Sequence, residues 1–503
     1  MSAQDSSVKN LYIVGAVSGL LKTALAVPIY FLLTPLVLKT LGAEMYAIWS
    51  LGAVVISLIN IFDFGFKNSV IKYVAEDPND KDKVSEYFTI FMSFYLFVGA
   101  FATLIVFAFH EYYVDDVLSV SSDYKLEAEF TLFITAFSFF FRFIASPYQA
   151  LIESKQKIYL SHIIFLVWLL SNFFLSVLGL KFYPGIYVLG LAMFVSNFLV
   201  FVLFFAVAKK EYPHRLFKYS NASYASFKKL LSFGLGIFVS SIVIIFREPI
   251  VKTIVVRFYG LEDSALFDIS YRTTVQIMSF LISPIMGTFA LAALYSTNKT
   301  KLEKAILPIF GYLVAFTLPL GVSILIFGEY LLEVWLAGSS VDISRLYPLV
   351  ICVTGAFLIY YIVEPIYKTN EAMGFSTLTA LIQLVSLVII ISMLFTLPAQ
   401  DVLNIGWSIL SGFTFYMAAN IGLSYWIFGK IYFVSIKSLF YIVIPTVCIV
   451  AATVMQRDTS LLVAFLLFAI YLFIHFYITK RQNVFDLGEL LFSLFNRIRQ
   501  KKV

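Results

Sequence analysis

The chain alternates between long apolar stretches and short polar breaks along nearly its whole length. Most apolar stretches hold about twenty residues or more, the length that an α-helix needs to cross a hydrocarbon core of ~30 Å. The first, 11–38, is too long for the apolar region of a signal peptide and lacks a small-residue cleavage site, so it is read as a span. Fourteen spans are predicted, near 11–38, 46–71, 87–109, 127–150, 158–180, 185–208, 231–256, 263–296, 305–327, 346–367, 375–397, 404–428, 438–455 and 460–479.

The composition agrees with this pattern. Hydrophobic residues make up 61% of the 503 residues and charged residues 13%, whereas a soluble protein carries about 25% charged residues. We therefore predict an all-α polytopic membrane protein. The two cysteines, Cys352 and Cys448, fall inside predicted spans and lack metal-site spacing, so no metal is predicted.

Lysine and arginine are distributed unequally between the breaks. With the N-terminus in the cytoplasm, the cytoplasmic breaks hold 24 of the 36 lysines and arginines, and the opposite breaks hold six. Cytoplasmic loops of membrane proteins carry such an excess. Because fourteen is even, both termini are predicted to be cytoplasmic. The formal net charge of +6 then reflects topology, and no nucleic-acid partner is predicted.

An internal repeat relates the two halves of the chain. The first span contains Gly15 and, thirteen residues later, Pro28-Ile29, and the G-x-E-x-x-A sequence at 42–47 follows it. The seventh span contains Gly236 and Pro249-Ile250 at the same spacing, and G-x-E-x-x-A recurs at 260–265, 218 residues after its first copy. Pro147 and Glu153 in the fourth span are matched at the same offset by Pro365 and Glu371. Duplicated halves are common in transporters.

The repeat divides the chain into two bundles of six spans with the same orientation, related by an axis along the membrane normal. Two further spans and a basic tail follow, and the tail has apolar residues at the spacing of an interfacial helix. The predicted domains are an N-terminal bundle, a basic cytoplasmic linker, a C-terminal bundle, two extra spans and the amphipathic tail, at 1–208, 209–230, 231–428, 429–479 and 480–503.

Two stretches carry a resemblance to a known family. PLVLKTLGAEMYAIWSL (Pro35 to Leu51) and FDFGFKNSVIKYVAE (Phe62 to Glu76) resemble the LG-x-E-x-Y-G-x-W turn and the FD-x-G sequence of bacterial O-antigen and capsule-repeat flippases. These flippases form the polysaccharide branch of the multidrug/oligosaccharidyl-lipid/polysaccharide (MOP) exporter superfamily. Ala47 stands where the second glycine of the turn is expected.

The resemblance implies two bundles arranged in a V around a central lumen, and alternating access. It implies a flippase of the bacterial cytoplasmic (inner) membrane that moves an undecaprenyl-diphosphate-linked oligosaccharide, an O-antigen, capsule or exopolysaccharide repeat. Implied partners are the polyprenyl-diphosphate-linked glycan, membrane lipids and other polysaccharide-assembly proteins. Many O-antigen flippases have twelve spans, whereas flippases for lipid-linked peptidoglycan precursors have fourteen. That substrate, and drug or metabolite export, therefore stay open as alternatives.

Ten ionisable residues fall well within predicted spans. A charged side chain at the middle of a membrane helix costs about 2.5–3.5 kcal/mol on insertion scales, so these residues are expected to face one another or a wet cavity. Six are cations and four are anions: Lys22, Lys67, Arg142, Arg247, Lys252 and Arg272 against Asp63, Glu248, Asp268 and Glu364.

Three oppositely charged pairs are spaced i,i+4: Asp63 with Lys67, Glu248 with Lys252, and Asp268 with Arg272. Residues at this spacing share a helix face, so these pairs are either structural ion pairs or part of the lumen. The six cations are predicted to line the lumen and to bind the diphosphate, because Arg offers forked donors to phosphate and Lys a compact charge.

Energy coupling and bending are assigned to further residues of the spans. No G-x-x-x-x-G-K-[ST] sequence occurs, so no nucleotide cofactor is predicted, and H⁺ or Na⁺ is the candidate coupling ion. Asp63, Asp268 and Glu364 are the candidate coupling carboxylates, and stabilisation of a helix break at Pro365 is the alternative role for Glu364. Pro28 and Pro249 are predicted hinges, because proline removes a helical hydrogen bond.

An enzyme is the alternative of a different class. Membrane glycosyltransferases and polymerases usually carry catalytic groups on a large exported loop. The longest outer loops predicted here have only about twenty residues, and the four histidines are dispersed along the chain. A transporter without catalytic residues is therefore predicted.

Overall fold

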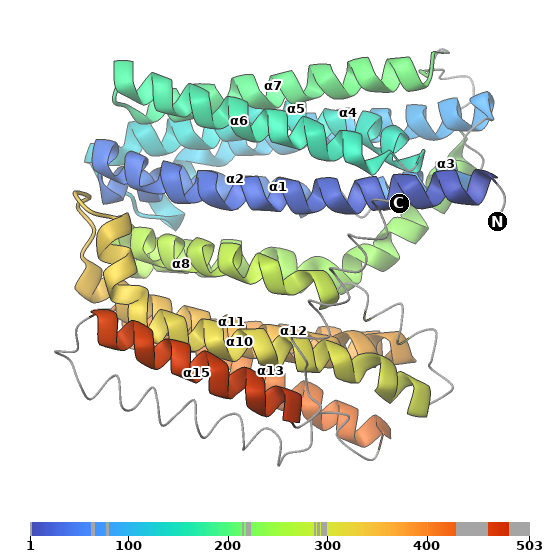
Figure 1. The fold of residues 1–503 in the computed structure, drawn as a ribbon. Helices are drawn as coiled ribbons and strands as arrows, with labels where there is room; N and C mark the ends of the chain where they lie inside the picture. The colour runs from blue at the N-terminus through green and yellow to red at the C-terminus, as the bar shows by residue number, and fades with distance from the viewer. Residues whose placement is uncertain are drawn as a thin grey trace. The chain divides into compact units, whose positions relative to one another are not determined.

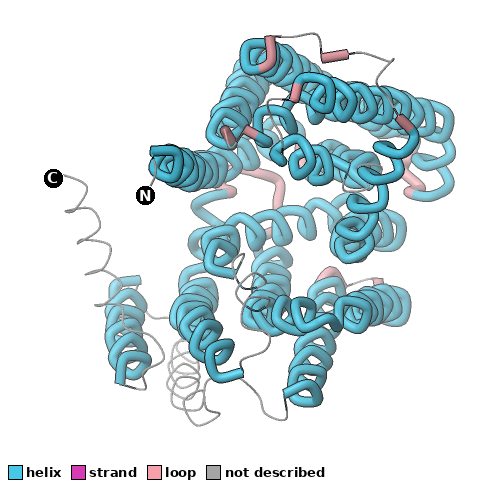
Figure 2. The backbone as a smooth tube through the Cα atoms, turned by 90° about the vertical axis from the view of Figure 1, so that its right-hand side faces the viewer, coloured by secondary structure: helices cyan, strands magenta, loops and turns pink. Residues whose placement is uncertain are grey.

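The computed structural model describes most of the chain. The described residues are 3–61, 66–76, 80–155, 157–213, 216–217, 223–285, 288, 292, 299–399, 401–428 and 461–481. Within these ranges the regular structure is helical, without strands (Figure 2). The helices are α1 (Ala3–Leu41), α2 (Ala43–Ile61), α3 (Phe66–Glu76), α4 (Lys81–Tyr112), α5 (Lys125–Ser154), α6 (Ile158–Phe182), α7 (Ile186–Glu211), α8 (Tyr224–Ile285), α10 (Lys299–Trp335), α11 (Ile343–Asn370), α12 (Ser376–Thr396), α13 (Leu403–Phe428) and α15 (Leu461–Arg481).

The predicted class, an all-α polytopic membrane protein, is confirmed. Seven stretches of the described residues are long and apolar enough to cross a membrane. One of them, Ile343–Thr396, covers both α11 and α12. The α15 helix lies at the predicted fourteenth span, whereas the thirteenth span and the tail from 482 onward lie outside the described residues. The count of fourteen stays a prediction.

The chain folds as two units with dense internal contacts. Unit 1 comprises Met1–Asp268 with Gly338–Val341, and unit 2 comprises Ile269–Ala337 with Asp342–Val503. Within unit 1, α5 packs most extensively against α7, and α4 and α6 also adjoin this pair (Figure 1). The predicted domain boundaries follow spans rather than contacts, and they stay predictions.

The helices repeat at the offset found in the sequence. The first residues of α4 and α10 are 218 positions apart, as are those of α5 and α11 and those of α6 and α12. The packing repeats as well, because α11 packs most extensively against α13 in unit 2, just as α5 packs against α7 in unit 1. These helices bear out the predicted duplication.

The two glycines of the repeated G-x-E-x-x-A sequence share a backbone conformation. Gly42, between α1 and α2, has φ +85°, and Gly260, inside α8, has φ +88°. At Gly260 the backbone leaves helical geometry, with ψ 176°, so α8 consists of two helical segments joined at this residue. Residues other than glycine rarely adopt a positive φ, because their Cβ clashes with the backbone. The break separates the predicted seventh and eighth spans.

The core of unit 1 is aromatic. Phe66, Phe91 and Tyr95 are almost completely buried, and the ring centroids of Tyr95 and Phe143 stack at 4.1 Å. The Phe66 ring stacks on Phe94 at 4.7 Å. These contacts join α3, α4 and α5, and they hold the helices that carry the charged residues described next.

Candidate functional site

An ion pair joins α3 to α5 inside unit 1. The Lys67 ammonium lies 3.3 Å from the Glu153 carboxylate, and the two side chains are 25% and 14% exposed. Gln149, one turn before Glu153 on α5, donates a hydrogen bond of 2.7 Å to the same carboxylate. Glu153 therefore receives donors from its own helix and from a neighbouring one.

Two further cations lie near this pair. Lys22 on α1 is within electrostatic range of both Arg142 and Glu153, and Arg142 interacts electrostatically with Glu153 along α5. Each cation also faces an aromatic ring. The Lys22 ammonium lies 4.7 Å from the ring centroid of Phe165, and the Arg142 guanidinium lies 5.7 Å from that of Phe204.

We call this group the Glu153 cluster. Its members are Lys22, Lys67, Arg142, Gln149 and Glu153. Three helices of unit 1 contribute to it, and among the described residues Lys67 contacts Glu153 directly, whereas Lys22 and Arg142 are attracted to the same carboxylate electrostatically. The cluster can accept an anion, because Lys22 and Arg142 contribute positive charge beyond what the Lys67–Glu153 pair neutralises.

A second ion pair is fully buried in unit 1. The Lys252 ammonium contacts the Asp268 carboxylate, and the side chains are 0% and 2% exposed. Lys252 also donates to the Ser50 carbonyl at 2.8 Å, and the Tyr46 hydroxyl donates to Asp268 at 2.9 Å. The break at Gly260 lies between the paired residues and lets them meet. This partnership differs from the predicted i,i+4 pairing of Lys252 with Glu248.

The buried carboxylate of unit 2 lies among tyrosines. Glu364 on α11 is 8% exposed and accepts a hydrogen bond of 3.2 Å from the Tyr416 hydroxyl on α13. The Tyr416 ring stacks on Tyr360 with centroids 5.0 Å apart. The α11 helix continues through Pro365, directly after Glu364. Glu364 is thus a membrane carboxylate held between two helices of one unit.

The other predicted residues are placed as follows. Arg247 is partly buried in the unit 1 segment of α8, and Arg272 is partly buried in the segment that belongs to unit 2. Asp63 lies outside the described residues. The α1 helix continues through Pro28 and the α8 helix through Pro249. The lumen, coupling and hinge roles stay predictions.

Some cluster members were absent from the predicted site. The sequence marks Glu153 only as a landmark of the repeat, and it does not distinguish Gln149 from other polar residues. Gln149 lies at the end of the fourth predicted span, and Glu153 follows that span by three residues. The sequence feature that predicts a role for Gln149 is its i,i+4 spacing from Glu153, which places the two side chains on one helix face. Groups of three or more His, Cys, Asp or Glu able to hold a metal ion do not occur among the residues with a described placement.

Comparison with known proteins identifies the family. The sequence profile described as "Polysaccharide biosynthesis protein" matches residues 14–290, more than half of the chain. The chain belongs to this family. Among curated proteins, the uncharacterized membrane protein EpsK of Bacillus subtilis (strain 168) is 24% identical to this chain over 206 residues. That match covers 40% of this chain and 40% of EpsK, so the chain spans less than half of this relative's length in the alignment.

Solved structures show the fold of this polysaccharide biosynthesis family member. The lipid II flippase MurJ, in an inward closed conformation, superposes with a TM-score of 0.69 at 15% identity, covering 94% of this chain and all of that one. An inward-facing multidrug resistance MATE transporter of the MOP superfamily gives a TM-score of 0.66 at 12% identity, with 87% and 96% coverage. The chain therefore has the polytopic MOP fold, which agrees with the resemblance in its sequence.

Proposed function

We propose that this protein is a flippase that moves a polyprenyl-diphosphate-linked oligosaccharide across the bacterial cytoplasmic membrane by alternating access. The observation that carries the proposal is the Glu153 cluster, in which Lys22 and Arg142 add positive charge to an ion pair inside a membrane-spanning bundle. The family description and the flippase among the similar folds support the same substrate class.

The cations of the Glu153 cluster are costly to place in a membrane. Each charged side chain at mid-membrane costs about 2.5–3.5 kcal/mol unless it is compensated. The Lys67–Glu153 pair compensates itself, whereas Lys22 and Arg142 share Glu153 with it. A diphosphate of about two negative charges would compensate these two cations during passage, through charge-assisted hydrogen bonds. An organic cation would be repelled by them, so the cluster disfavours a cationic drug as the substrate.

Two alternatives share the fold. A lipid-linked peptidoglycan precursor also contains a diphosphate, and one similar fold belongs to a lipid II flippase. A drug or metabolite exporter is the second alternative, because another similar fold belongs to a multidrug resistance transporter. The family description favours a polysaccharide repeat over both.

For energy coupling we propose an ion gradient of H⁺ or Na⁺. Among the carboxylates predicted for this role, Asp268 is engaged with Lys252 in a buried pair, which makes Asp268 the weaker candidate. Glu364 is buried beside the Tyr416 hydroxyl, which can donate to its charged form. A buried membrane carboxylate of this kind is a common proton or ion relay. Asp63 stays a candidate from the sequence alone.

Deletion followed by lipid analysis tests the substrate class. Cells that lack this protein are expected to accumulate a polyprenyl-diphosphate-linked oligosaccharide on the cytoplasmic face, and extracted lipids would identify it by mass. Complementation with the wild-type chain should clear the intermediate. Accumulation of a peptidoglycan precursor instead would select that alternative, and an unchanged lipid-linked pool would contradict the flippase assignment.

A further inference from the structure

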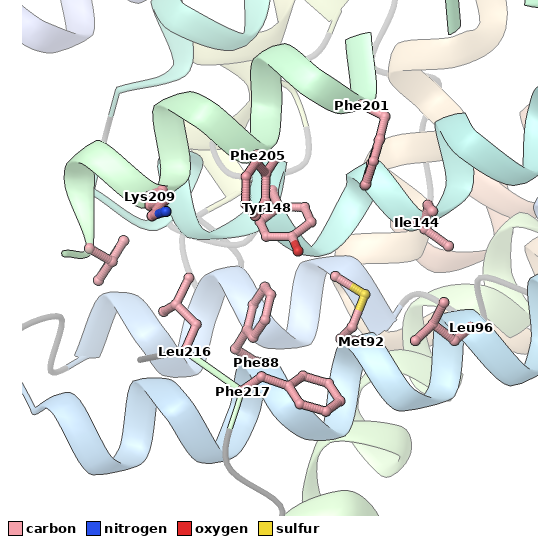
Figure 3. A pocket seen from close by; sticks show the side chains of 11 residues that line it. Phe88, Met92, Leu96, Ile144, Tyr148, Phe201, Phe205, Lys209, Leu216 and Phe217 are labelled. Atoms are coloured by element: carbon pink, nitrogen blue, oxygen red, sulfur yellow. The ribbon is translucent and has the colours of Figure 1, made fainter. Parts of the chain in front are cut away.

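A groove lies on unit 1, and its lining includes no member of the Glu153 cluster. Its walls come from α4, α5 and α7 and from the described part of the segment that follows α7, at 212 and 216–217 (Figure 3). Its volume is about 470 Å³, within the range of roughly 300–1,000 Å³ that is typical of small-molecule pockets. The Thr89 hydroxyl on α4 donates to the Leu216 carbonyl at 3.3 Å, which holds the segment over the groove.

The lining is apolar and aromatic, with one charge. Phe88, Phe201 and Phe205 project into the groove from two sides, and Lys209 stands at one end (Figure 3). The groove is open along its length, since Leu96 is 39% exposed and Phe205 is 42% exposed. On a membrane-spanning helix, exposed apolar side chains face lipid hydrocarbon. A concave apolar surface at this place fits a flexible chain.

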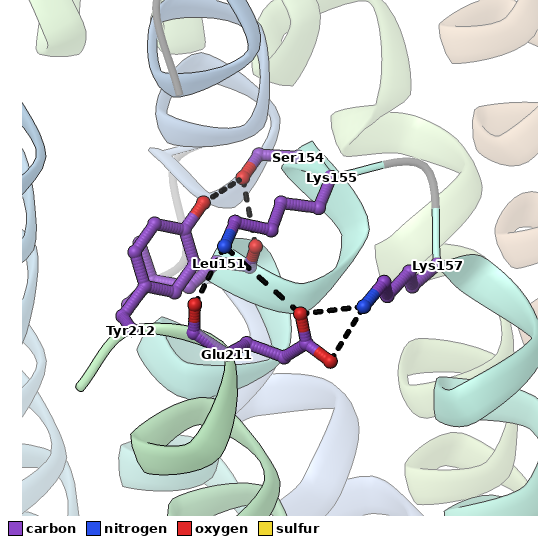
Figure 4. A network of polar contacts seen from close by, with 6 residues as sticks. All are labelled: Leu151, Ser154, Lys155, Lys157, Glu211 and Tyr212. Carbon is purple, nitrogen blue, oxygen red and sulfur yellow. Dashed lines mark hydrogen bonds and ion pairs between the residues drawn. The ribbon is translucent and has the colours of Figure 1, made fainter. Parts of the chain in front are cut away.

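The charged end of the groove is fixed by a polar network (Figure 4). Lys157 donates to both carboxylate oxygens of Glu211 at 2.6 Å, and Lys155 donates to the Glu211 carbonyl at 2.6 Å. The Lys155 ammonium also lies 3.9 Å from the ring centroid of Tyr212, a residue of the groove wall. Burial lowers the pKa of Lys155. The network ties the α5–α6 connection to the end of α7.

Lys209 differs from these two lysines. It is exposed at the last turn of α7, and its ammonium lies 5.9 Å from the Phe205 ring centroid, at the mouth of the groove. This end of unit 1 is the one predicted to face the cytoplasm, where anionic lipid headgroups attract basic residues. The apolar groove ends at a lysine on this side, so it complements a hydrocarbon chain that ends at a phosphate.

We propose that this groove binds an acyl chain of an anionic phospholipid from the cytoplasmic leaflet, with Lys209 on the headgroup phosphate. The site is separate from the transported substrate and does not depend on its identity. Bound lipid would fill the space between α4 and α7 and brace the segment at 216–217 against α4. The four elements of the wall would then move as one body.

Native mass spectrometry of the full-length protein in detergent tests this proposal. The probes are palmitoyl-oleoyl phosphatidylglycerol and palmitoyl-oleoyl phosphatidylcholine, which share their acyl chains and differ in headgroup charge. Wild-type protein is expected to bind phosphatidylglycerol about fivefold more tightly, because a lysine near an anionic surface contributes about that factor. Leu96→Trp replaces the leucine side chain with a bulkier indole ring in the groove. It is expected to reduce binding of both lipids severalfold.

Matched variants control for folding and for general charge. Leu104→Trp replaces another exposed leucine of the same helix, 64% exposed and outside the groove, and it should bind both lipids like wild type. Lys209→Gln should abolish the headgroup preference, whereas Lys210→Gln, at the neighbouring exposed lysine, should keep it. Lys209 is exposed, so its replacement leaves the fold intact.

Four results would overturn the proposal. These are equal binding by Leu96→Trp and wild type, an unchanged headgroup preference in Lys209→Gln, displacement of the lipid by inorganic phosphate alone, and preferential displacement by undecaprenyl diphosphate. The third would show an anion site without a chain site. The fourth would assign the groove to the transported lipid.

Discussion

Lys252 and Asp268 form a fully buried ion pair across the break at Gly260, although they are sixteen positions apart in the chain. Lys252 also donates to the Ser50 carbonyl, and Asp268 also accepts from the Tyr46 hydroxyl. Tyr46 belongs to the first copy of the repeated turn sequence, and Gly260 begins the second. The pair thus ties the unit 1 segment of α8 to α2, and we expect Lys252 to act in stability rather than in the lumen.

Removing one partner of this pair should destabilise the protein. Lys252→Met removes the Lys252 ammonium from the buried Asp268 carboxylate, and this is expected to cost about 3–5 kcal/mol in free energy of unfolding. The double variant Lys252→Met with Asp268→Leu should recover most of the loss. Thermal unfolding in detergent measures both. Normal stability of Lys252→Met together with lost transport would instead favour the lumen role.

The positive φ at Gly260 predicts a second stability effect. Gly260→Ala is expected to cost about 1–3 kcal/mol, because its φ of 88° and ψ of 176° suit glycine alone. A Cβ at Gly260 would have no atom within 4 Å, so the cost is that of the backbone. Gly355→Ala on α11, equally uncrowded, is the control and should be neutral or stabilising. Equal melting temperatures for the two variants would rule out backbone strain at Gly260.

Arg247 is predicted to bind the diphosphate or an acidic sugar. Arg247→Ala should then lose most transport at normal expression and stability, and Arg247→Lys should retain part of it, because the charge survives without the fork. Transport assays and thermal unfolding are measured together on the same preparations. Stability that falls in step with activity, restored by a charge swap with a partner carboxylate, would make Arg247 a structural residue.

The topology prediction concerns both ends of the chain. A reporter active only in the exported compartment should be silent when it is fused after Lys502 and active when it is inserted in the 110–125 loop. The physical reason is the excess of Lys and Arg on the side assigned to the cytoplasm. An active fusion after Lys502 would be incompatible with fourteen spans and a cytoplasmic N-terminus.

Much of the fold was predictable because hydrophobic length and the repeat are local properties of the sequence. The offset of 218 recurs in the helix starts, and both glycines of the G-x-E-x-x-A sequence adopt positive φ. Pairing of charges was less predictable. The i,i+4 rule assumes a continuous helix, and the break at Gly260 brings Lys252 to a carboxylate sixteen residues away.

The Glu153 cluster shows the same limit. Lys22, Lys67 and Arg142 were predicted to line a lumen, but their approach to Glu153 depends on how α1, α3 and α5 pack. Single-helix spacing cannot supply this arrangement. Gln149 is hard to predict as a site residue because an uncharged side chain stands out little among the polar residues at the end of a span.

Lys22 and Arg142 are proposed to compensate the charge of the diphosphate during passage. The most direct measurement is the transfer rate of a polyprenyl-diphosphate-linked oligosaccharide, extracted from the deletion strain, across proteoliposomes holding each variant. Lys22→Gln and Arg142→Gln should each slow transfer about tenfold or more, the value of one charge-assisted hydrogen bond, with unchanged melting temperature. Lys181→Gln, an exposed lysine at the end of α6, should transfer like wild type. Wild-type transfer by the double variant Lys22→Gln with Arg142→Gln would contradict this role for the two cations.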